Sequence, residues 1–176
     1  MITTPVPPLT PRLRSLGVHL RPRTEMDADF LRDVYFAYRW EEVERTGWPE
    51  VVRRAFLADQ HRLQCRHYEE HYPDAAYSVV EEHGQPVGRL YTLYSADDLR
   101  IMDIALMPQA RGKGLGGALL EAVLRQAGAL GAARISIHVE QNNPARRLYE
   151  RQGFSRVGEA GVYDLLERRP DLVTVH

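Results

Sequence analysis

A glycine-rich turn at residues 112–117 has the composition of an anion-binding site. It reads Gly-Lys-Gly-Leu-Gly-Gly and follows Arg111, so two cations stand beside four glycines. The first N–H groups of a helix have no partner within it, and Ser, Thr, Asp or Asn usually caps them. Here no such residue is present, and the helix end carries partial positive charge. The turn therefore favours a phosphate or pyrophosphate; a tight strand-to-helix turn with solvated cations is the structural alternative.

Two common nucleotide-binding patterns fit this turn differently. A nucleoside-triphosphate P-loop needs a glycine five residues before the Gly-Lys pair and Ser or Thr after the lysine, and this chain has methionine and glycine there. The dinucleotide pattern matches formally at Gly112, Gly114 and Gly117, with Glu140 as a ribose ligand. However, the preceding strand contains two charged residues where a central parallel strand is apolar. A Rossmann-type oxidoreductase is thus the less favoured alternative.

A second segment places the turn in a family. Residues 111–116 resemble the R/Q-x-x-G-x-G/A signature of the GNAT-type N-acetyltransferase superfamily, and "NNPARRLYERQGF" over residues 142–154 resembles the segment that follows it in that family. The order of elements agrees with the family from Val18 onwards. The resemblance implies a GNAT-like acyl-CoA N-acyltransferase fold and an acetyl-CoA-dependent N-acetyltransferase whose turn holds the pyrophosphate of acetyl-CoA.

The resemblance also implies which residues bind the cofactor. The backbone of the strand before the turn would hold the pantetheine arm and face the acetyl carbonyl. Asn142 would touch the cofactor arm, while Asn143 and Pro144 have the chemistry of a helix cap and a first helical residue. The implied cofactor-binding set is Ile104, Ala105, Leu106, Arg111, Gly112, Lys113, Gly114, Leu115, Gly116, Gly117 and Asn142.

Acetyl transfer to an amine needs a neutral nucleophile, a stabilised oxyanion and a proton for the departing thiolate. Tyr149 matches the family tyrosine that serves as general acid, because a phenol of pKa about 10 is protonated at neutral pH. Its alternative role is a core aromatic, and one tyrosine can fill both roles. Asp103 and Glu140 are candidates for the general base, and His138 is a third. A regulatory module that binds acetyl-CoA without turnover is the alternative from another class.

In this family, the acceptor is bound largely by the first two helices and their connection. That segment here mixes rings with charges, as a pocket for an amine-bearing ligand would, although amphipathic packing explains the rings equally well. The tentative acceptor-binding residues are Tyr35, Tyr38, Trp40 and Glu41, and the same segment also contains Arg39, Glu44 and Trp48. The expected partner is a small-molecule or peptide amine that the sequence does not identify further.

The first half of the chain predicts an antiparallel sheet preceded by helices. A short strand over residues 18–22 is followed by a helix that begins near Thr24 and a second helix that runs from Pro49 towards His71. Two β-rich runs around residues 83–85 then predict a hairpin, and a third strand over residues 99–107 completes the meander.

The second half predicts a β-α-β-α-β pattern. A helix over residues 115–130, a strand over residues 134–139 and a helix over residues 144–152 lead to strands near Phe154 and Val162. The expected fold is a mixed α/β sheet of about seven strands flanked by about four helices.

Composition limits the remaining options. With 176 residues, of which 44% are hydrophobic, the chain suits one domain. The 23 basic and 24 acidic residues nearly cancel, which argues against nucleic-acid and membrane partners. Cys65 is the only cysteine, which excludes an internal disulfide, implies no metal site and suits the cytoplasm. We expect a flexible proline-rich tail over residues 1–16 and a single acetyltransferase domain over residues 17–176, with a homodimer left open.

Overall fold

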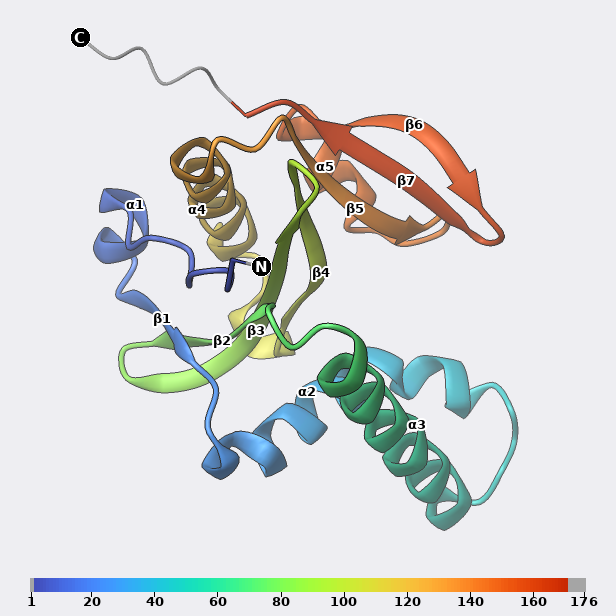
Figure 1. Ribbon diagram of the computed structural model, residues 1–176. Helices are drawn as coiled ribbons and strands as arrows, with labels where there is room; N and C mark the ends of the chain where they lie inside the picture. Colours follow the sequence, from blue (N-terminus) through green and yellow to red (C-terminus); the bar gives the residue numbers. More distant parts are fainter. Residues whose placement is uncertain (1, 171–176) are drawn as a thin grey trace, which may run out of the picture.

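A seven-stranded mixed sheet in the order β1-β2-β3-β4-β5-β7-β6 forms the centre of the computed structural model, which describes residues 2–170 (Figure 1). Among the described strands, β4 and β5 run parallel and every other neighbouring pair is antiparallel. This topology confirms the mixed α/β fold and excludes the Rossmann alternative, which needs a parallel sheet. The strands are β1 (Val18–Pro22), β2 (Ala76–Glu82), β3 (Gln85–Ser95), β4 (Asp98–Leu106), β5 (Arg134–Glu140), β6 (Ser155–Ala160) and β7 (Tyr163–Arg168).

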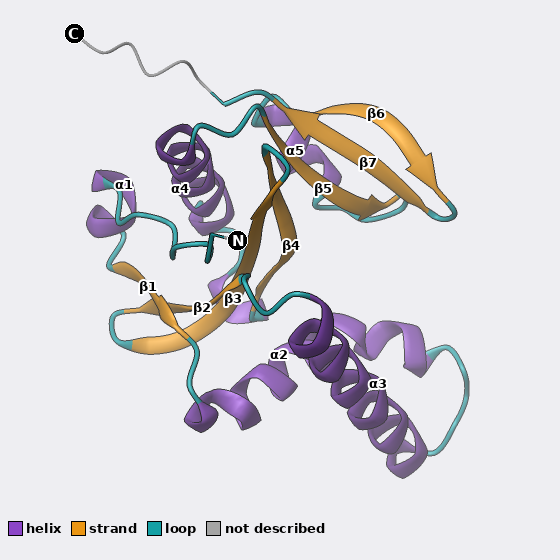
Figure 2. Ribbon diagram, viewed as in Figure 1, coloured by secondary structure: helices purple, strands orange, loops and turns teal. Residues whose placement is uncertain are grey.

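Helices cover both faces of the sheet. In Figure 2, α1 and α4 lie on one side of β3 and β4, and α2 and α3 lie on the other. Helix α1 is additional to the four helices that the sequence predicts. No helix was expected there, since it lies within the segment predicted to be a flexible tail. The helices are α1 (Pro11–Ser15), α2 (Ala28–Glu44), α3 (Glu50–His71), α4 (Leu115–Leu130) and α5 (Arg146–Arg151), with 3₁₀ turns η1 (Glu25–Asp27) and η2 (Pro108–Ala110).

Helix α4 supplies the main apolar face of the core. Leu119, Ala122 and Val123 recur at helical spacing and are fully buried against sheet residues such as Leu90 and Ile135. Burial of this continuous face fixes the helix axis relative to the sheet. The position of its first turn, which carries the glycine motif, follows from that packing.

Two-residue turns join the strands of the meander. His83 and Gly84 connect β2 to β3, and Ala96 and Asp97 connect β3 to β4; all four have positive φ. Such turns match the twist of antiparallel strands. The hairpin predicted around residues 83–85 is therefore confirmed.

One extra residue in β4 interrupts its pairing with β3. Tyr91 pairs with Asp103 and Thr92 pairs with Ile101, so Met102 has no partner on β3. This is a β-bulge, which bends the strand and increases its local twist. It lies in the middle of the strand that leads to the glycine turn.

The bulge also decides where two charged side chains point. Arg100 pairs with Leu93, and Asp103 pairs with Tyr91, two residues away on the same strand. Directly opposed residues point to the same face of a sheet, and so do residues two apart. Arg100 and Asp103 therefore share a face, whereas residues three apart in a regular strand point to opposite faces.

The N-terminal residues do not form the free tail that their proline content predicts. The Thr4 hydroxyl accepts a hydrogen bond from the backbone N–H of Tyr94 at 2.9 Å. The Thr10 hydroxyl caps α1, and Leu13 is fully buried in the main core. The prediction is wrong because an extended proline-containing segment needs no hydrogen bonds of its own and can pack along a surface. Residue 1 of that tail and residues 171–176 of the predicted domain lie outside the described residues.

Helix α2 begins at Ala28, four residues later than the predicted start near Thr24, because a 3₁₀ turn over Glu25–Asp27 comes first. The backbone N–H of Thr24 donates to the Asp27 carboxylate at 2.7 Å, and Arg21 donates to the same carboxylate through both terminal nitrogens at 2.8 Å. These bonds, above all the one from Arg21, lower the pKa of Asp27 to about 2. The corner therefore holds an ionised carboxylate at neutral pH.

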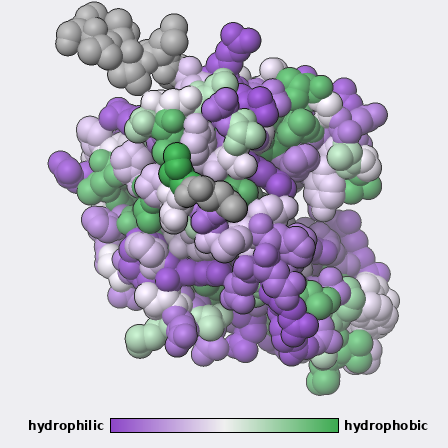
Figure 3. Space-filling model, in the orientation of Figure 1, coloured by the Kyte–Doolittle hydropathy of each residue, from purple (hydrophilic) through white to green (hydrophobic). Residues whose placement is uncertain are grey.

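The surface has no dominant apolar region on the face drawn in Figure 3, where hydrophilic and hydrophobic residues are interspersed. In residues 2–170, no helix combines the length and the hydropathy that crossing a membrane requires.

Candidate active site

The parallel strands β4 and β5 separate before they end. Their pairing stops at Ile101 and Ile137, although β4 continues to Leu106 and β5 continues to Glu140. The bulge at Met102 directly follows the last pair, and β5 stays paired with β7 to its end. The edge of β4 that faces β5 is therefore left without a strand partner beyond the bulge, and its backbone groups are available to a ligand that contains amides.

A cavity of about 550 Å³ extends from this separation to the glycine turn. The predicted cofactor-binding residues line it, with the exception of Lys113 and Asn142. This cofactor-side cavity thus joins the free edge of β4 to the N-terminus of α4 in one continuous space. Sequence reasoning missed some of its other lining residues, namely Ala37, Pro144, Ala145, Leu148 and Arg151.

The backbone of the glycine turn is shaped to present its N–H groups. Gly112 and Gly114 have φ of +76° and +84°, which side chains rarely tolerate, and Gly114 is the N-cap of α4 without any side-chain cap. In the described part of the chain, no hydrogen bond engages the N–H groups of residues 112–117. A diphosphate at this helix end would meet unoccupied donors and a favourable dipole.

The positive charge near the turn differs from the prediction. Lys113 pairs with Glu82 of β2 at 3.1 Å and does not line the cavity. Arg111 lines the cavity, and its Nε donates to the Leu106 carbonyl at 2.9 Å, which ties the turn to the end of β4. Arg12 of α1 also approaches, because a Cβ at Gly117 would lie 3.4 Å from its Nη2 atom. Arg12 belongs to the segment that was expected to be a tail.

Tyr149 lies where the cofactor-side cavity meets a second cavity. Its ring is 5% exposed and packs edge-on against Phe154, with ring centroids 6.1 Å apart. Its hydroxyl makes no hydrogen bond to any described residue, although the side chain lines both cavities. Burial, followed by the nearby Tyr38 and the charge of Asp103, raises the pKa of Tyr149. The ring thus packs in the core while the hydroxyl stays protonated and free to donate.

Asn143, rather than Asn142, lies at the site. Asn142 is exposed and lines neither cavity, whereas Asn143 lines both and donates to the Tyr38 hydroxyl at 3.1 Å. The Asn143 carboxamide oxygen also accepts from the Ala145 N–H at 2.9 Å, which is the predicted capping chemistry. Helix α5 nevertheless begins at Arg146, two residues later than predicted, because residues 144–145 form a turn.

A second cavity of about 400 Å³ lies on the far side of Tyr149. It brings together all three candidates for the general base, Asp103, Glu140 and His138, and it includes Tyr38. We refer to it as the acceptor-side cavity. Sequence reasoning missed its lining residues Gln64, Tyr68, Arg100, Met102 and Tyr163, which come from helices and strands far apart in the chain.

The three base candidates differ in how free they are. Asp103 accepts a hydrogen bond from Arg89, which is 3% exposed and needs this partner for its charge. The Glu140 carboxylate makes no hydrogen bond or ion pair to the described residues, and the backbone carbonyl of Glu140 accepts a bond from the Asn143 N–H at 2.9 Å. Burial, followed by the charge of Arg100, lowers the pKa of His138, so its imidazole is neutral at neutral pH. Glu140 and His138 are therefore freer to accept a proton than Asp103.

Most of the tentative acceptor residues lie elsewhere. Tyr35 is buried between α2 and α3, where its hydroxyl accepts a hydrogen bond from Arg39. Trp40 packs on the same cluster, and Glu41 lines the cofactor-side cavity instead. Only Tyr38 of the tentative four, together with Arg39, lines the acceptor-side cavity among the described residues. The rings of Tyr35 and Trp40 serve the amphipathic packing that was the alternative explanation.

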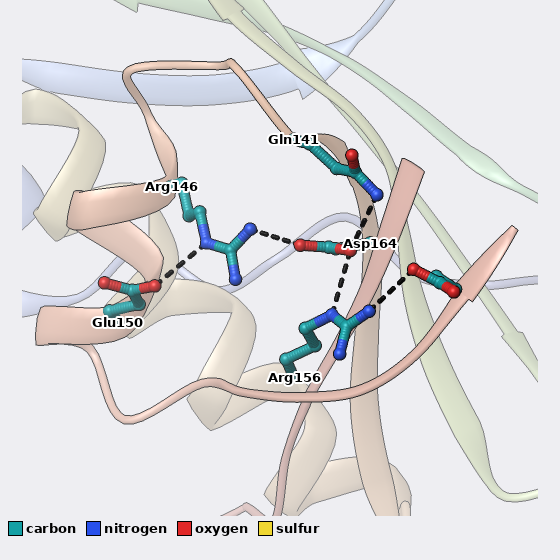
Figure 4. Close-up of polar contacts among 6 residues, drawn as sticks. Gln141, Arg146, Glu150, Arg156 and Asp164 are labelled. Atoms are coloured by element: carbon teal, nitrogen blue, oxygen red, sulfur yellow. Dashed lines mark hydrogen bonds and ion pairs between the residues drawn. The ribbon is translucent and has the colours of Figure 1, made fainter. Parts of the chain in front are cut away.

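A buried carboxylate fixes α5, which carries Tyr149, to the sheet (Figure 4). Asp164 of β7 is 3% exposed and accepts hydrogen bonds from Arg146 of α5, Arg156 of β6 and Gln141 after β5. These partners, Arg156 first, hold the pKa of Asp164 below its usual value. The network links the ends of three strands to the first turn of α5, so it sets the position of Tyr149 one turn later.

Comparison with known proteins identifies the family. A family model described as the acetyltransferase (GNAT) family matches residues 35–154, which include β4, the glycine turn and Tyr149. The chain belongs to this family, and the resemblance seen in its sequence is confirmed.

Curated relatives match over part of the chain. It is 36% identical over 83 residues to YhfO of Bacillus subtilis strain 168, an uncharacterized N-acetyltransferase, which covers 43% of this chain and 56% of that protein. It is 33% identical over 87 residues to a putative ribosomal protein bS18-alanine N-acetyltransferase of the same strain, covering 49% of this chain and 58% of that one. The chain thus spans a little over half the length of these curated relatives.

Solved structures share the fold over most of the chain. The PaiA N-acetyltransferase of Thermoplasma acidophilum, in complex with coenzyme A, has a TM-score of 0.68 at 15% identity over 86% of this chain and 98% of that chain. The spermidine N-acetyltransferase of Vibrio cholerae, in complex with CoA and spermine, has a TM-score of 0.60 at 20% identity over 88% and 96%. At these identities the likeness shows the fold alone.

Proposed function

We propose that this protein transfers the acetyl group of acetyl-CoA directly to an amine of a small molecule or peptide. The observation that carries the proposal is the separation of β4 from β5 beyond Ile101 and Ile137, with one cavity leading to the free N–H groups of α4 and another to the base candidates. A thioester bound along β4 would have its acyl group where the two cavities meet, beside Tyr149.

The donor site rests on backbone groups. The N–H groups of residues 112–117 would hold the pyrophosphate, with Arg111 as the adjacent cation. The free edge of Ile104–Leu106 would pair with the amides of pantetheine and offer an N–H to the carbonyl oxygen as it becomes an oxyanion. Acetyl-CoA supplies the activated acyl group; the chain's part is to hold and orient it.

The proton transfers can be assigned to groups on either side of that junction. The amine nitrogen attacks the carbonyl carbon, the C–N bond forms and the C–S bond breaks. Glu140 or His138, directly or through water, takes the proton that the nitrogen loses, and the Tyr149 hydroxyl donates a proton to the departing sulfur. Because burial keeps Tyr149 protonated, its donor form is present throughout the neutral range.

A regulatory module that binds acetyl-CoA without turnover is the alternative. The acceptor-side cavity supports turnover, because its lining includes a carboxylate and a phenol hydroxyl that have no side-chain partner among the described residues, together with a neutral imidazole. Binding of the donor alone would need only the cofactor-side cavity.

We also propose that residues 17–176 form one catalytic domain to which α1 adds packing, and that the protein acts in the cytoplasm, as its single cysteine suggests. Sedimentation velocity distinguishes a monomer from the homodimer left open by the sequence.

The test is release of free CoA thiol from acetyl-CoA with a broad panel of amines. We expect amine-dependent thiol release, and a rise of the melting temperature with CoA but not with a nicotinamide dinucleotide. Tight CoA binding without thiol release for any amine would favour the regulatory module. No stabilisation by CoA at all would refute the donor site.

A further inference from the structure

Arg100 lines the acceptor-side cavity, and no carboxylate of residues 2–170 forms an ion pair with it. Its Nε atom is buried and makes no hydrogen bond to the described residues. Its guanidinium carbon lies 5.9 Å from the centroid of the Tyr72 ring. Contact with a tyrosine face at that distance contributes little compared with an ion pair. A partly buried guanidinium in a cavity wall therefore retains capacity for an anion.

The carboxylates closest along the strands are already engaged. Asp98 accepts a hydrogen bond from the Ser136 hydroxyl at 2.7 Å through Oδ2, and its Oδ1 has no hydrogen bond to the described residues but forms an ion pair with Arg134 at 3.9 Å. Asp103 accepts the hydrogen bond of the buried Arg89. Removing a charge from water is costly unless an opposite charge compensates it. The charge of Arg100 is therefore available to pair with an anionic group of a ligand that enters the cavity.

The acceptor-side cavity consequently has two ends of opposite character. Asp103 lies where β4 has left β5, and Glu140 and Tyr149 line the wall nearby, so this end adjoins the proposed reaction centre. Arg100 still pairs with Ser136 of β5, so it lies at the closed end of the strand separation. The bulge brings the side chains of Arg100 and Asp103 to one face of β4, about two strand steps or roughly 7 Å apart.

We propose that the acceptor is an amine that also carries a carboxylate, with the carboxylate bound by Arg100 and the amine beside Asp103 and Glu140. A guanidinium and a carboxylate form strong charge-assisted hydrogen bonds in a site of this kind. An acceptor with a second ammonium group at that position would instead face the like charge of Arg100. The inference rests on the proposed acetyl transfer and names the acceptor class for the same site.

The experiment compares acceptors of matched length. It measures kcat/KM for 6-aminohexanoate, n-hexylamine and hexamethylenediamine, and for shorter aminocarboxylates against alkylamines with the same number of carbons. For the preferred length, we expect the aminocarboxylate to exceed the alkylamine by at least about tenfold. In Arg100→Gln that ratio should fall to about one, whereas Arg125→Gln, which alters an exposed arginine on α4, should keep it.

Two outcomes would overturn the inference: a preference for the diamine at every length, or an aminocarboxylate preference that survives in Arg100→Gln. Calorimetry with the CoA-saturated protein separates this inference from the proposed function. If no amine is acetylated but an aminocarboxylate binds the wild type and not Arg100→Gln, acetyl transfer fails and the binding site stands. Equal binding to both proteins, or binding to neither, rejects the site.

Discussion

Replacing Tyr149 by phenylalanine removes one hydroxyl and leaves the ring in place. We expect kcat to fall about a hundredfold, which corresponds to about 2.7 kcal/mol of transition-state stabilisation, because the thiolate would leave without a positioned proton donor. The affinity for CoA should change little, since the backbone of β4 and of the glycine turn carries donor binding.

The same substitution should leave stability nearly unchanged. The ring of Tyr149 is 5% exposed against Phe154, and phenylalanine retains that contact. The hydroxyl has no hydrogen bond to a described residue, so its loss should change the free energy of unfolding by less than about 0.5 kcal/mol. Tyr149→Ala is the matched control, because loss of the ring should cost about 3–5 kcal/mol.

Single-turnover thiol release, with enzyme in excess over acetyl-CoA, measures the chemical step without product release. Urea unfolding of the same samples gives the stability. A phenylalanine variant that retains the wild-type single-turnover rate would refute the acid role. A variant that loses activity and stability together would show that the hydroxyl has a structural role that its contacts do not reveal.

Three further substitutions test the donor site and the electrostatics of the fold. Gly114→Ala should destabilise the apoprotein by about 1–2 kcal/mol because of its φ of +84°, and should abolish the rise in melting temperature with CoA; a shift as large as that of the wild type would contradict the site. Burial lowers the pKa of His61 to about 4, so the unfolded state binds more protons between about pH 6.5 and 4, and stability should fall as pH falls through that range. His61→Gln should therefore flatten the profile of melting temperature against pH. Parallel profiles for the variant and the wild type would contradict this role of His61. Arg21 lowers the pKa of Asp27 to about 2, so the stability due to that carboxylate is present above about pH 4 and is lost as pH falls towards 2. Asp27→Asn should therefore destabilise the protein at neutral pH, and the difference in melting temperature from the wild type should vanish in acid. A difference that stays constant with pH would contradict this pairing.

The sequence by itself determined the features that depend on residues close together in the chain. The uncapped start of α4 is visible because helix capping, backbone freedom and the dipole all concern a few consecutive residues. The apolar face of α4 and the turn at residues 83–85 are local in the same sense. The assignment of Tyr149 to a helix followed from the spacing of its motif, although α5 begins two residues later than predicted.

Only the tertiary structure decided which groups pair with the charged side chains and on which face of a strand each side chain lies. The bulge at Met102 exists because β3 pairs on both sides of it, and it alone puts Arg100 and Asp103 on one face. Lys113 forms an ion pair with Glu82, which lies 31 positions earlier in the chain. The packing of residues 2–16 depends on contacts with β3 and α4. Such contacts have no local signature, because cross-strand register is settled by distant segments that fold onto one another. The cofactor turn could therefore be predicted, whereas the acceptor-side cavity could not.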